Sequence, residues 1–402
     1  MKTVSCILFS VLFINISNTY AAALDRSGQS IATFLQAGNY AEIGISIVNP
    51  HVSGQLKSDF NKGGLTQAAN MDTGNVAHGT LLPSATLKFQ LNEHLSLGLL
   101  YDHPFGADAS YPIKQYPAYT QDQERTATQV SIQSLSSILG YQPDMHWNFY
   151  AGPVLQLAEG QNKTRGAGYN WLRYDMKISD TVEAGWLAGF AYTIPEKAIK
   201  TSLTYRSEIR HKTDVTESVS ALHPINGVID FGIDTQQIIL RSPQSINLEL
   251  QTGILPKTIA YANLRWVDWS KFDVSPPKLY QSTQALLGKG IALVAYKDDQ
   301  FSANFGVGRK INDQWSSSIT LGWDSGAGDP ITTLGPTKGY WSLGLASKFN
   351  PSSKYSIGFG IKYFWLGDAK SQPASDFATQ RYDGIFKNNY AWGYGLNFGY
   401  RF

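Results

Sequence analysis

Few side chains in this sequence are arranged for covalent chemistry. Its seven histidines stand at positions 51, 78, 94, 103, 146, 211 and 223, scattered along the chain and mostly near turns or loop edges. A serine nucleophile needs a base such as histidine beside it, and neither G-x-S-x-G nor H-E-x-x-H occurs. A P-loop and a dinucleotide-binding fingerprint are absent as well. The sequence therefore supports no enzyme, no metal site and no bound cofactor.

Among the ionisable residues, Arg206 is the one whose pattern suggests binding. The segment 202–206 alternates polar and apolar side chains, a period of two that is typical of a strand. Arg206 lies on the polar face, which we expect to point inward, and Glu208 lies on the same face. A carboxylate left unpaired in an apolar site is costly. Arg206 could therefore bind the carboxylate of a ligand, or it could form an ion pair with Glu208.

The strands that must position such residues have an unusual composition. Charged residues make up 16% of the chain, against roughly 25% in soluble domains, and aromatic residues make up 13%. The mean hydropathy is nevertheless only −0.21. A transmembrane β-barrel has such a composition, because one face of each strand meets lipid and the other meets water. A net charge of +2 gives no reason to expect a nucleic-acid partner.

The last segment of the chain shows the barrel pattern most clearly. Small or polar residues alternate there with an apolar set, which consists of Tyr390, Trp392, Tyr394, Leu396, Phe398, Tyr400 and Phe402. The same alternation recurs upstream, for example in the segments 301–307 and 355–365. We expect a final strand that closes the barrel against the first strand, with aromatic side chains at the membrane interfaces.

The first residues have the layout of a secretory signal peptide. Lys2 supplies a positive charge, the apolar stretch 7–16 is too short to cross a bilayer, and small residues follow at 21–23. We assign residues 1–23 to this signal. The only cysteine, Cys6, lies within it. No later segment reaches roughly 18 apolar residues, so the exported chain is either soluble or an outer-membrane barrel.

Alternating short and long connections predict the topology. Short turns are expected near residues 92, 143, 196, 256, 312 and 350. Long links are expected near 57–77, 106–123, 160–180, 210–235, 273–298, 324–339 and 366–387. They join fourteen antiparallel strands in an all-β transmembrane barrel, with short periplasmic turns and long extracellular loops. Twelve or sixteen strands are the alternatives.

A barrel of that size encloses more room than its own side chains fill. We assign residues 40–402 to the barrel and residues 24–39 to a short N-terminal plug, or hatch, in its lumen. Ile31, Phe34 and Leu35 share one helical face. Leu24, Phe34 and Leu35 could present an apolar surface to a ligand. The alternative is a periplasmic tail.

Four motifs resemble segments of one family, the FadL family of outer-membrane transporters for long-chain fatty acids and other hydrophobic compounds. Leu203–Glu208 (LTYRSE) resembles its TYRSE segment, and Trp269–Phe272 (WSKF) resembles its W-S-x-F. Tyr296–Asp298 resembles an aromatic-Lys-Asp motif, and Trp323–Ser325 resembles an aspartate-serine motif after the eleventh strand. The resemblance covers nearly the whole chain and implies a fourteen-stranded barrel with a hatch.

The resemblance also implies a route for the ligand. Family members capture it between long loops, hold it in an inner pocket and release it sideways through a kink in the third strand. Pro104, Phe105 and Gly106 correspond to that kink, and proline and glycine both weaken strand pairing. A plain strand end is the alternative. The Asn-Pro-Ala sequence of many family hatches is missing here, which puts a hatch mechanism in doubt.

The resemblance places the head group of a fatty acid at Lys297. The alternative is an exposed lysine paired with a neighbouring aspartate. A second basic position of the family falls near Glu159, where Lys163 or Arg165 could substitute. In the loops, Trp171 and Leu172 could form an apolar capture groove or could simply pack together.

These observations predict passive transport of fatty acids or other hydrophobic molecules across the bacterial outer membrane. A general diffusion porin is the alternative, and it would need an open, charged constriction. We expect a monomer surrounded by outer-membrane lipid and lipopolysaccharide.

Overall fold

The computed structural model describes residues 24–61, 70–112, 118, 120–223, 227–376 and 379–402. Within these residues the chain is mostly strand. They contain one α-helix, α1 (Pro277–Leu287), and three short 3-10 helices, η1 (Ala167–Tyr169), η2 (Pro195–Lys197) and η3 (Ala374–Asp376). The predicted all-β fold is confirmed. The predicted signal peptide, residues 1–23, lies outside the described residues.

Long strands form one large antiparallel sheet. They are β1 (Tyr40–His51), β3 (Thr80–Gln90), β4 (Leu95–Ser110), β7 (Ala127–Tyr141), β8 (Trp147–Thr164), β9 (Leu172–Ile194), β10 (Ile199–Arg206), β11 (Ile209–His223), β12 (Gly227–Ser242), β13 (Ser245–Leu255), β14 (Thr258–Val267), β17 (Gln300–Lys310), β18 (Trp315–Asp324), β20 (Tyr340–Phe349), β21 (Tyr355–Leu366) and β24 (Tyr390–Arg401).

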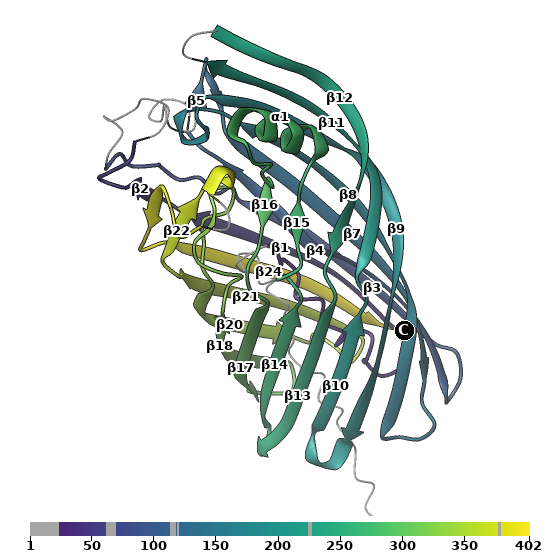
Figure 1. Cartoon of the computed structure of the whole chain (residues 1–402). Helices are drawn as coiled ribbons and strands as arrows, with labels where there is room; N and C mark the ends of the chain where they lie inside the picture. The colour runs from purple at the N-terminus through teal and green to yellow at the C-terminus, as the bar shows by residue number, and fades with distance from the viewer. Residues whose placement is uncertain (1–23, 62–69, 113–117, 119, 224–226, 377–378) are drawn as a thin grey trace, which may run out of the picture.

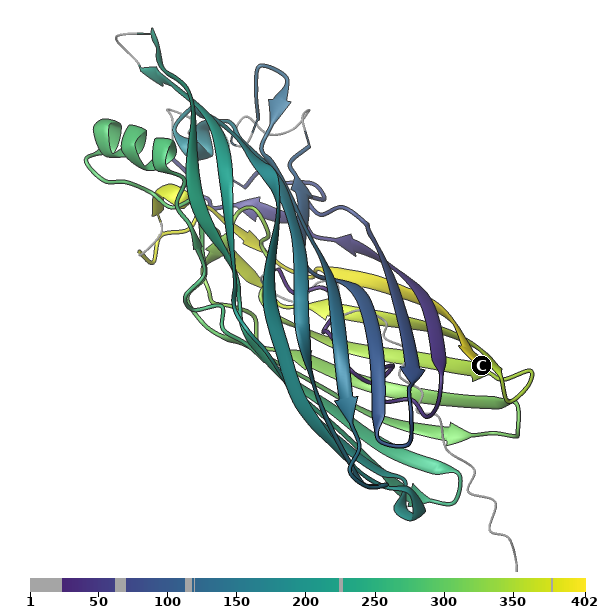
Figure 2. The ribbon, with the colours of Figure 1, turned by 90° about the vertical axis from the view of Figure 1, so that its right-hand side faces the viewer.

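The sheet closes on itself as a fourteen-stranded barrel, as predicted. β1 pairs with β24, and β9 pairs with β10. β10 and β11 continue each other along β9 in a single register, so they occupy one position in the ring. β12 and β13 do the same along β11 and β10. Figures 1 and 2 show β11 and β12 extending beyond the ring at the end opposite the C-terminus.

The two ends of the barrel differ as expected. The six predicted short turns all join neighbouring strands at one end, and β24 finishes there as well. The loops at the other end carry α1 and the short strands. These strands are β2 (Gly54–Leu56), β5 (Thr120–Gln121), β6 (Glu124–Arg125), β15 (Asp273–Val274), β16 (Val294–Ala295), β19 (Ile331–Thr332), β22 (Ala369–Gln372) and β23 (Gly384–Phe386).

Two expected long links are mainly strand. β8 runs to Thr164 and β9 begins at Leu172. The segment 210–235 is mostly the hairpin of β11 and β12. On β11 the alternation is the reverse of the membrane pattern, because Val215 and Val219 are buried and Thr216 is exposed, whereas Ile233 of β12 is exposed. A search for apolar side chains facing lipid therefore passes over β11.

The membrane face carries the predicted side chains. On β24 the aromatic residues that alternate from Tyr390 are exposed, and the residues between them are mostly buried. Ile43, Ile45 and Ile47 of β1 are exposed in the same way. Because they lie on the outside of a closed barrel, these residues provide the apolar band that a bilayer needs.

The plug, residues 24–39, lies inside the barrel and bonds to its inner wall. Asn247 donates to the carbonyl of Gly28, and Thr86 donates to Thr33. The main apolar core lies on the loop side of the plug, where side chains from the strands and loops meet. The lumen is thus divided into an apolar half near the loops and a second half near the turns.

Candidate ligand-binding site

Four aromatic rings meet in the lumen where the plug, β4 and the loops come together. Trp269 is fully buried, and its ring centre lies 5.4 Å from Phe105, 5.1 Å from Phe272 and 5.4 Å from Tyr296, each edge to face. We call Phe105, Trp269, Phe272 and Tyr296 the aromatic cluster. Edge-to-face contacts are the favoured geometry for such rings, and the same surface would suit an aromatic or aliphatic ligand.

The cluster has few polar groups, and most of these are satisfied. Trp269 Nε1 donates to Gln300 Oε1 at 2.7 Å. Burial raises the pKa of Tyr296, with a smaller opposing effect from the positive charge of Arg26. The phenol therefore stays neutral at physiological pH. A neutral, apolar surface is what contact with a hydrophobic ligand requires.

Phe105 reaches the cluster because β4 is irregular at this point. The register between β4 and β7 shifts between Asp102 and Phe105, which marks a bulge. Pairing between β3 and β4 ends at Ala85 and Tyr101. The three residues predicted as the kink, Pro104, Phe105 and Gly106, therefore lie beside a gap in the hydrogen-bond pairing of β3 with β4.

Proline on both strands explains the gap. Pro83 of β3 and Pro104 of β4 have no backbone N–H to donate across it. The His103 ring instead reaches the carbonyl of Pro83, with Nδ1 at 3.2 Å from the oxygen. Beyond the gap, pairing resumes where Ala77 lies opposite Ala109. The gap in pairing is therefore bounded on both sides along the strands.

The N-terminus of the plug pairs with the inner edge of the same bulge. Arg26 N donates to the Pro104 carbonyl at 2.7 Å, and Gly106 N donates to the Leu24 carbonyl at 2.8 Å. A Cβ on Gly106 would lie 2.8 Å from the carbonyl oxygen of Val130, so only glycine fits there. Leu24 is half-buried against the apolar core that contains the aromatic cluster. Plug, gap and cluster are therefore directly connected.

A buried ion pair fixes this part of the plug. Asp25 accepts from Arg265 Nε at 2.8 Å and from Nη2 at 3.2 Å, and both side chains are only 2% exposed. Arg265 also donates to Asn247 at 2.7 Å. Sequence reasoning missed this pair. The signal available was the inward position of Arg265 on its strand, close to the W-S-x-F motif.

Phe34 and Leu35 of the plug do not face the aromatic cluster. Phe34 is fully buried against the barrel wall, where the absent side chains of Gly98 and Gly140 leave room for its ring, and it packs edge to face on Tyr150. Leu35 is half-buried and faces the turn end. Of the three predicted apolar plug residues, only Leu24 therefore adjoins the loop-side core.

Arg206 is buried in the lumen beside the plug. It donates to Ser136 Oγ at 3.3 Å and to the Gln29 carbonyl at 3.4 Å, and its Nε has no partner. The predicted alternative, a pair with Glu208, is wrong. Glu208 instead accepts from Arg210 at 2.7 Å, because the strand breaks after Arg206. Arg206 lines a cavity of about 70 Å³ together with Asp102 and Ser27, which are hydrogen-bonded to each other.

The other predicted residues lie in the loops. Lys297 is exposed and stands beside Gly328, whereas its neighbour Tyr296 belongs to the aromatic cluster. Leu172 is buried in the loop-side core, and Trp171 is half-buried with a left-handed backbone. Arg165 is buried between Glu124 and Asp175. The carboxylate-binding role of Lys297 stays a prediction.

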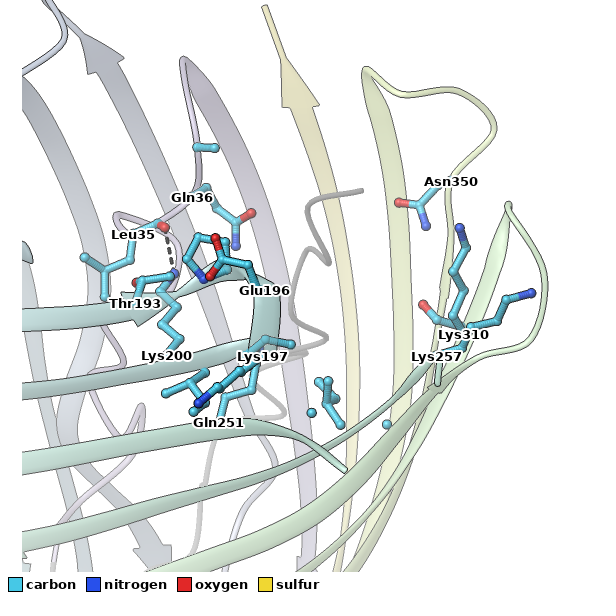
Figure 3. A pocket seen from close by; sticks show the side chains of 18 of the residues that line it. Leu35, Gln36, Thr193, Glu196, Lys197, Lys200, Gln251, Lys257, Lys310 and Asn350 are labelled. Carbon is cyan, nitrogen blue, oxygen red and sulfur yellow. Dashed lines mark hydrogen bonds between the residues drawn. The ribbon is translucent and has the colours of Figure 1, made fainter. Parts of the chain in front are cut away.

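On the turn side of the plug lies a cavity of about 1640 Å³, which we call the vestibule (Figure 3). The base of the plug, Leu35 to Gly38, forms part of its wall. Lysines from several turns and strands line it, and the bond between Lys200 and Leu35 is visible in Figure 3. The vestibule and the aromatic cluster are therefore on opposite sides of the plug.

Two further searches concern the described residues alone. None of their helices is long and apolar enough to cross a membrane. No group of three histidine, cysteine, aspartate or glutamate side chains is arranged to hold a metal ion within the described ranges.

A closed, lipid-facing barrel whose lumen holds a plug and an apolar core defines an outer-membrane transport protein. Residues 21–402 match the model of the family described as Outer membrane protein transport protein (OMPP1/FadL/TodX). The chain belongs to this family and is a multi-pass protein of the outer membrane. The resemblance found in the four sequence motifs is thereby confirmed.

Solved structures show the same fold. A FadL homologue of Pseudomonas aeruginosa is 14% identical, with a TM-score of 0.70 and 92% of each chain covered. The toluene transporter TodX of P. putida is 12% identical, with a TM-score of 0.65 over 92% of this chain and 91% of that one. The toluene transporter TbuX of Ralstonia pickettii is 11% identical, with a TM-score of 0.62 over 98% of this chain and all of that one. No curated protein sequence matches the chain.

Proposed function

We propose that this protein carries hydrophobic molecules passively across the outer membrane and binds them at the aromatic cluster above the plug. One observation carries the proposal. Phe105 belongs both to the buried cluster and to the bulge beside the gap in pairing of β3 with β4, so a ligand held by the cluster would lie next to the stretch of wall where the strands are not hydrogen-bonded to each other. A ligand leaving there would not need to cross water.

The chemistry of the cluster favours ligands that are wholly or mostly apolar. Burial of a hydrocarbon contributes about 0.8 kcal/mol per CH₂ group, and aromatic rings add edge-to-face contacts. Two of the similar structures are toluene transporters and another is a FadL homologue. We therefore propose small aromatic hydrocarbons or long-chain fatty acids as the substrate class.

A fatty acid would also need a partner for its carboxylate. Arg206 has a buried Nε without a hydrogen-bond partner, but its guanidinium is bonded to the plug at the Gln29 carbonyl. Lys297 lies on the loop side but is exposed. We propose that a fatty acid would enter tail first, with its head group held near Lys297 until the tail is buried. A hydrocarbon needs neither cation.

The route that we propose begins in the loops and ends in the membrane. Trp171 and Leu172 contribute apolar surface beside the loop-side core, where capture would start. The ligand then reaches the aromatic cluster and leaves between Pro83 and Pro104 into the surrounding lipid. Its concentration gradient drives the movement, and single copies of the chain suffice.

Uptake measurements test this function. Cells that lack their own carrier would express the wild type or Trp269→Ala, and uptake of radiolabelled toluene and of radiolabelled oleate would be measured. We expect Trp269→Ala to lower uptake of the transported compound, whereas Trp341→Ala, which removes an exposed tryptophan of β20, should leave uptake unchanged. A wild type that promotes uptake of neither compound, and instead conducts ions as an open pore in planar bilayers, would support the porin.

A further inference from the structure

The base of the plug is held by three cations that come from three different strands. Lys88 of β3 donates to the Gln36 carbonyl, and Lys200 of β10 donates to the Leu35 carbonyl at 2.7 Å. Arg401 of β24 donates to the Gln36 side-chain oxygen at 3.1 Å. Two consecutive residues of the plug, Leu35 and Gln36, are therefore hydrogen-bonded to three different strands of the barrel.

The backbone of the plug explains why cations are suited to this place. Leu35 N bonds to the Ile31 carbonyl and Gln36 N bonds to the Thr33 carbonyl, so the segment forms a helical turn that ends at the vestibule. The last carbonyl groups of such a turn have no partner within it. They also carry the negative end of its dipole, which favours a positive charge nearby.

The two lysines are unusually placed for charged groups. Lys88 is only 2% exposed, and its ammonium lies 5.9 Å from the centre of the Phe34 ring. Neither Lys88 nor Lys200 forms an ion pair with any residue that the structure describes. Their charge-assisted hydrogen bonds to the plug carbonyls therefore supply their main polar contacts.

Other lysines of the vestibule provide a contrast. Lys197 and Lys257 line the same cavity, are exposed and form no bond with the plug. Lys310 pairs with Asp313 at 2.8 Å. In Figure 3, Lys200 reaches Leu35, whereas Lys257 and Lys310 stand on the far side of the cavity from the plug. Positive charge in the vestibule and contact with the plug can thus be separated by mutation.

We propose that Lys88, Lys200 and Arg401 are positioning residues that clamp the C-terminal turn of the plug and make it a fixed floor of the lumen. With the floor in place, a ligand at the aromatic cluster has no direct way into the vestibule and must leave through the gap beside Phe105. This inference deepens the proposed function and rests on it for its role in transport, but the clamp itself can be tested without any ligand.

A buried cysteine can report movement of the floor. Ala32 is 5% exposed and small, and Cys6, which lies in the predicted signal peptide, is the chain's only natural cysteine. The Ala32→Cys protein, with Cys6 removed by processing or replaced by serine, would be reacted with a water-soluble maleimide. The rate would be compared after adding Lys88→Met, Lys200→Met or both. The matched controls are Lys197→Met and Lys257→Met, which remove the same charge from the same cavity.

Loss of one charge-assisted hydrogen bond should raise the labelling rate about ten- to a hundred-fold, and loss of both should raise it further. The control variants should label at the wild-type rate. Heat-modifiable migration on gels would establish that each barrel is folded, and planar bilayers should show more frequent open events for the clamp variants. Equal labelling rates and conductance in clamp and control variants would overturn the clamp, whatever the uptake experiment shows. Normal clamp behaviour without hydrophobic uptake would instead overturn the proposed function.

Discussion

The helix α1 depends on a carboxylate from a different part of the chain. Its N-cap residue is Pro276, which offers no side-chain oxygen to the first N–H groups of the helix. Glu217 of β11 takes that role: Oε2 accepts from Lys278 N and Oε1 accepts from Leu279 N, each at 2.9 Å. Tyr174 donates to the same carboxylate at 3.1 Å. We predict that Glu217→Gln releases the start of α1 while the barrel stays folded.

The size of the effect follows from these contacts. Glutamine keeps one acceptor oxygen, but its amide group faces an N–H and cannot accept from it. One charge-assisted hydrogen bond contributes about 1.5–3 kcal/mol, and the interaction of the charge with the helix dipole adds about 0.3–1 kcal/mol. The expected loss is therefore about 2–4 kcal/mol, or about 30- to 1000-fold in the opening equilibrium of α1.

Hydrogen exchange followed by mass spectrometry measures this opening directly. Peptides that cover α1 should exchange faster in Glu217→Gln by the factor above, and peptides from β17 and β18 should be unchanged. Asp214→Asn is the matched control, because Asp214 lies on the same strand but points outward and is exposed.

Two results would refute this reasoning. Unchanged exchange of α1 in Glu217→Gln would mean that packing, not the carboxylate, holds the helix. An equal increase in Asp214→Asn would mean that any loss of negative charge on β11 has the same effect. Because α1 lies against β11 and β12 at the loop end (Figure 1), its release should also change how quickly a ligand reaches the loops.

Two further predictions concern other charged groups. Asp25→Ala leaves Arg265 buried without its carboxylate and should lower the free energy of unfolding by about 3–5 kcal/mol. The double variant Asp25→Ala with Arg265→Met should regain most of this stability, and thermal unfolding of the two variants measures the difference. The hydrogen bond and charge of Arg165 hold the pKa of Glu124 below its usual value. The ionised Glu124 therefore stabilises β5–β6 fully above the unfolded pKa of about 4.3. This stabilisation is lost as the pH falls through the lower folded pKa. Amide protection of this hairpin, corrected for intrinsic exchange, should stay constant from about pH 7 to 5 and fall below that range, and Glu124→Gln should remove the dependence.

The barrel was predictable because lipid imposes a strict rule on every strand. Each outward residue must be apolar and each strand must find partners on both sides, so a period of two and short turns are visible in the sequence. β24 and the six turns follow this rule. β11 instead buries its valines and exposes polar side chains, so the same rule failed there.

Site residues were harder to predict because loops and the plug have no period. The resemblance pointed to Tyr296–Asp298, where Tyr296 is buried and Lys297 is exposed. Within the segment predicted as the plug, Phe34 packs on the barrel wall, because two glycines at distant positions leave room for it. Such a fit depends on which strands become neighbours, and this information appears only once the barrel has closed.

The division of the lumen by the plug decides which direction is open to a hydrophobic ligand. Above the plug, burial of apolar surface at the aromatic cluster is favourable by about 25 cal/mol per Å². Below it, the vestibule is lined by several lysines as well as apolar side chains and is partly open, so the same surface would be buried less completely there. A ligand that crossed the plug would therefore lose part of the favourable interaction before it reached another apolar phase. On the route that we propose, the gap in strand pairing beside Phe105 joins one apolar environment to the next, so lateral movement would be the direction along which the free energy of an apolar ligand stays low.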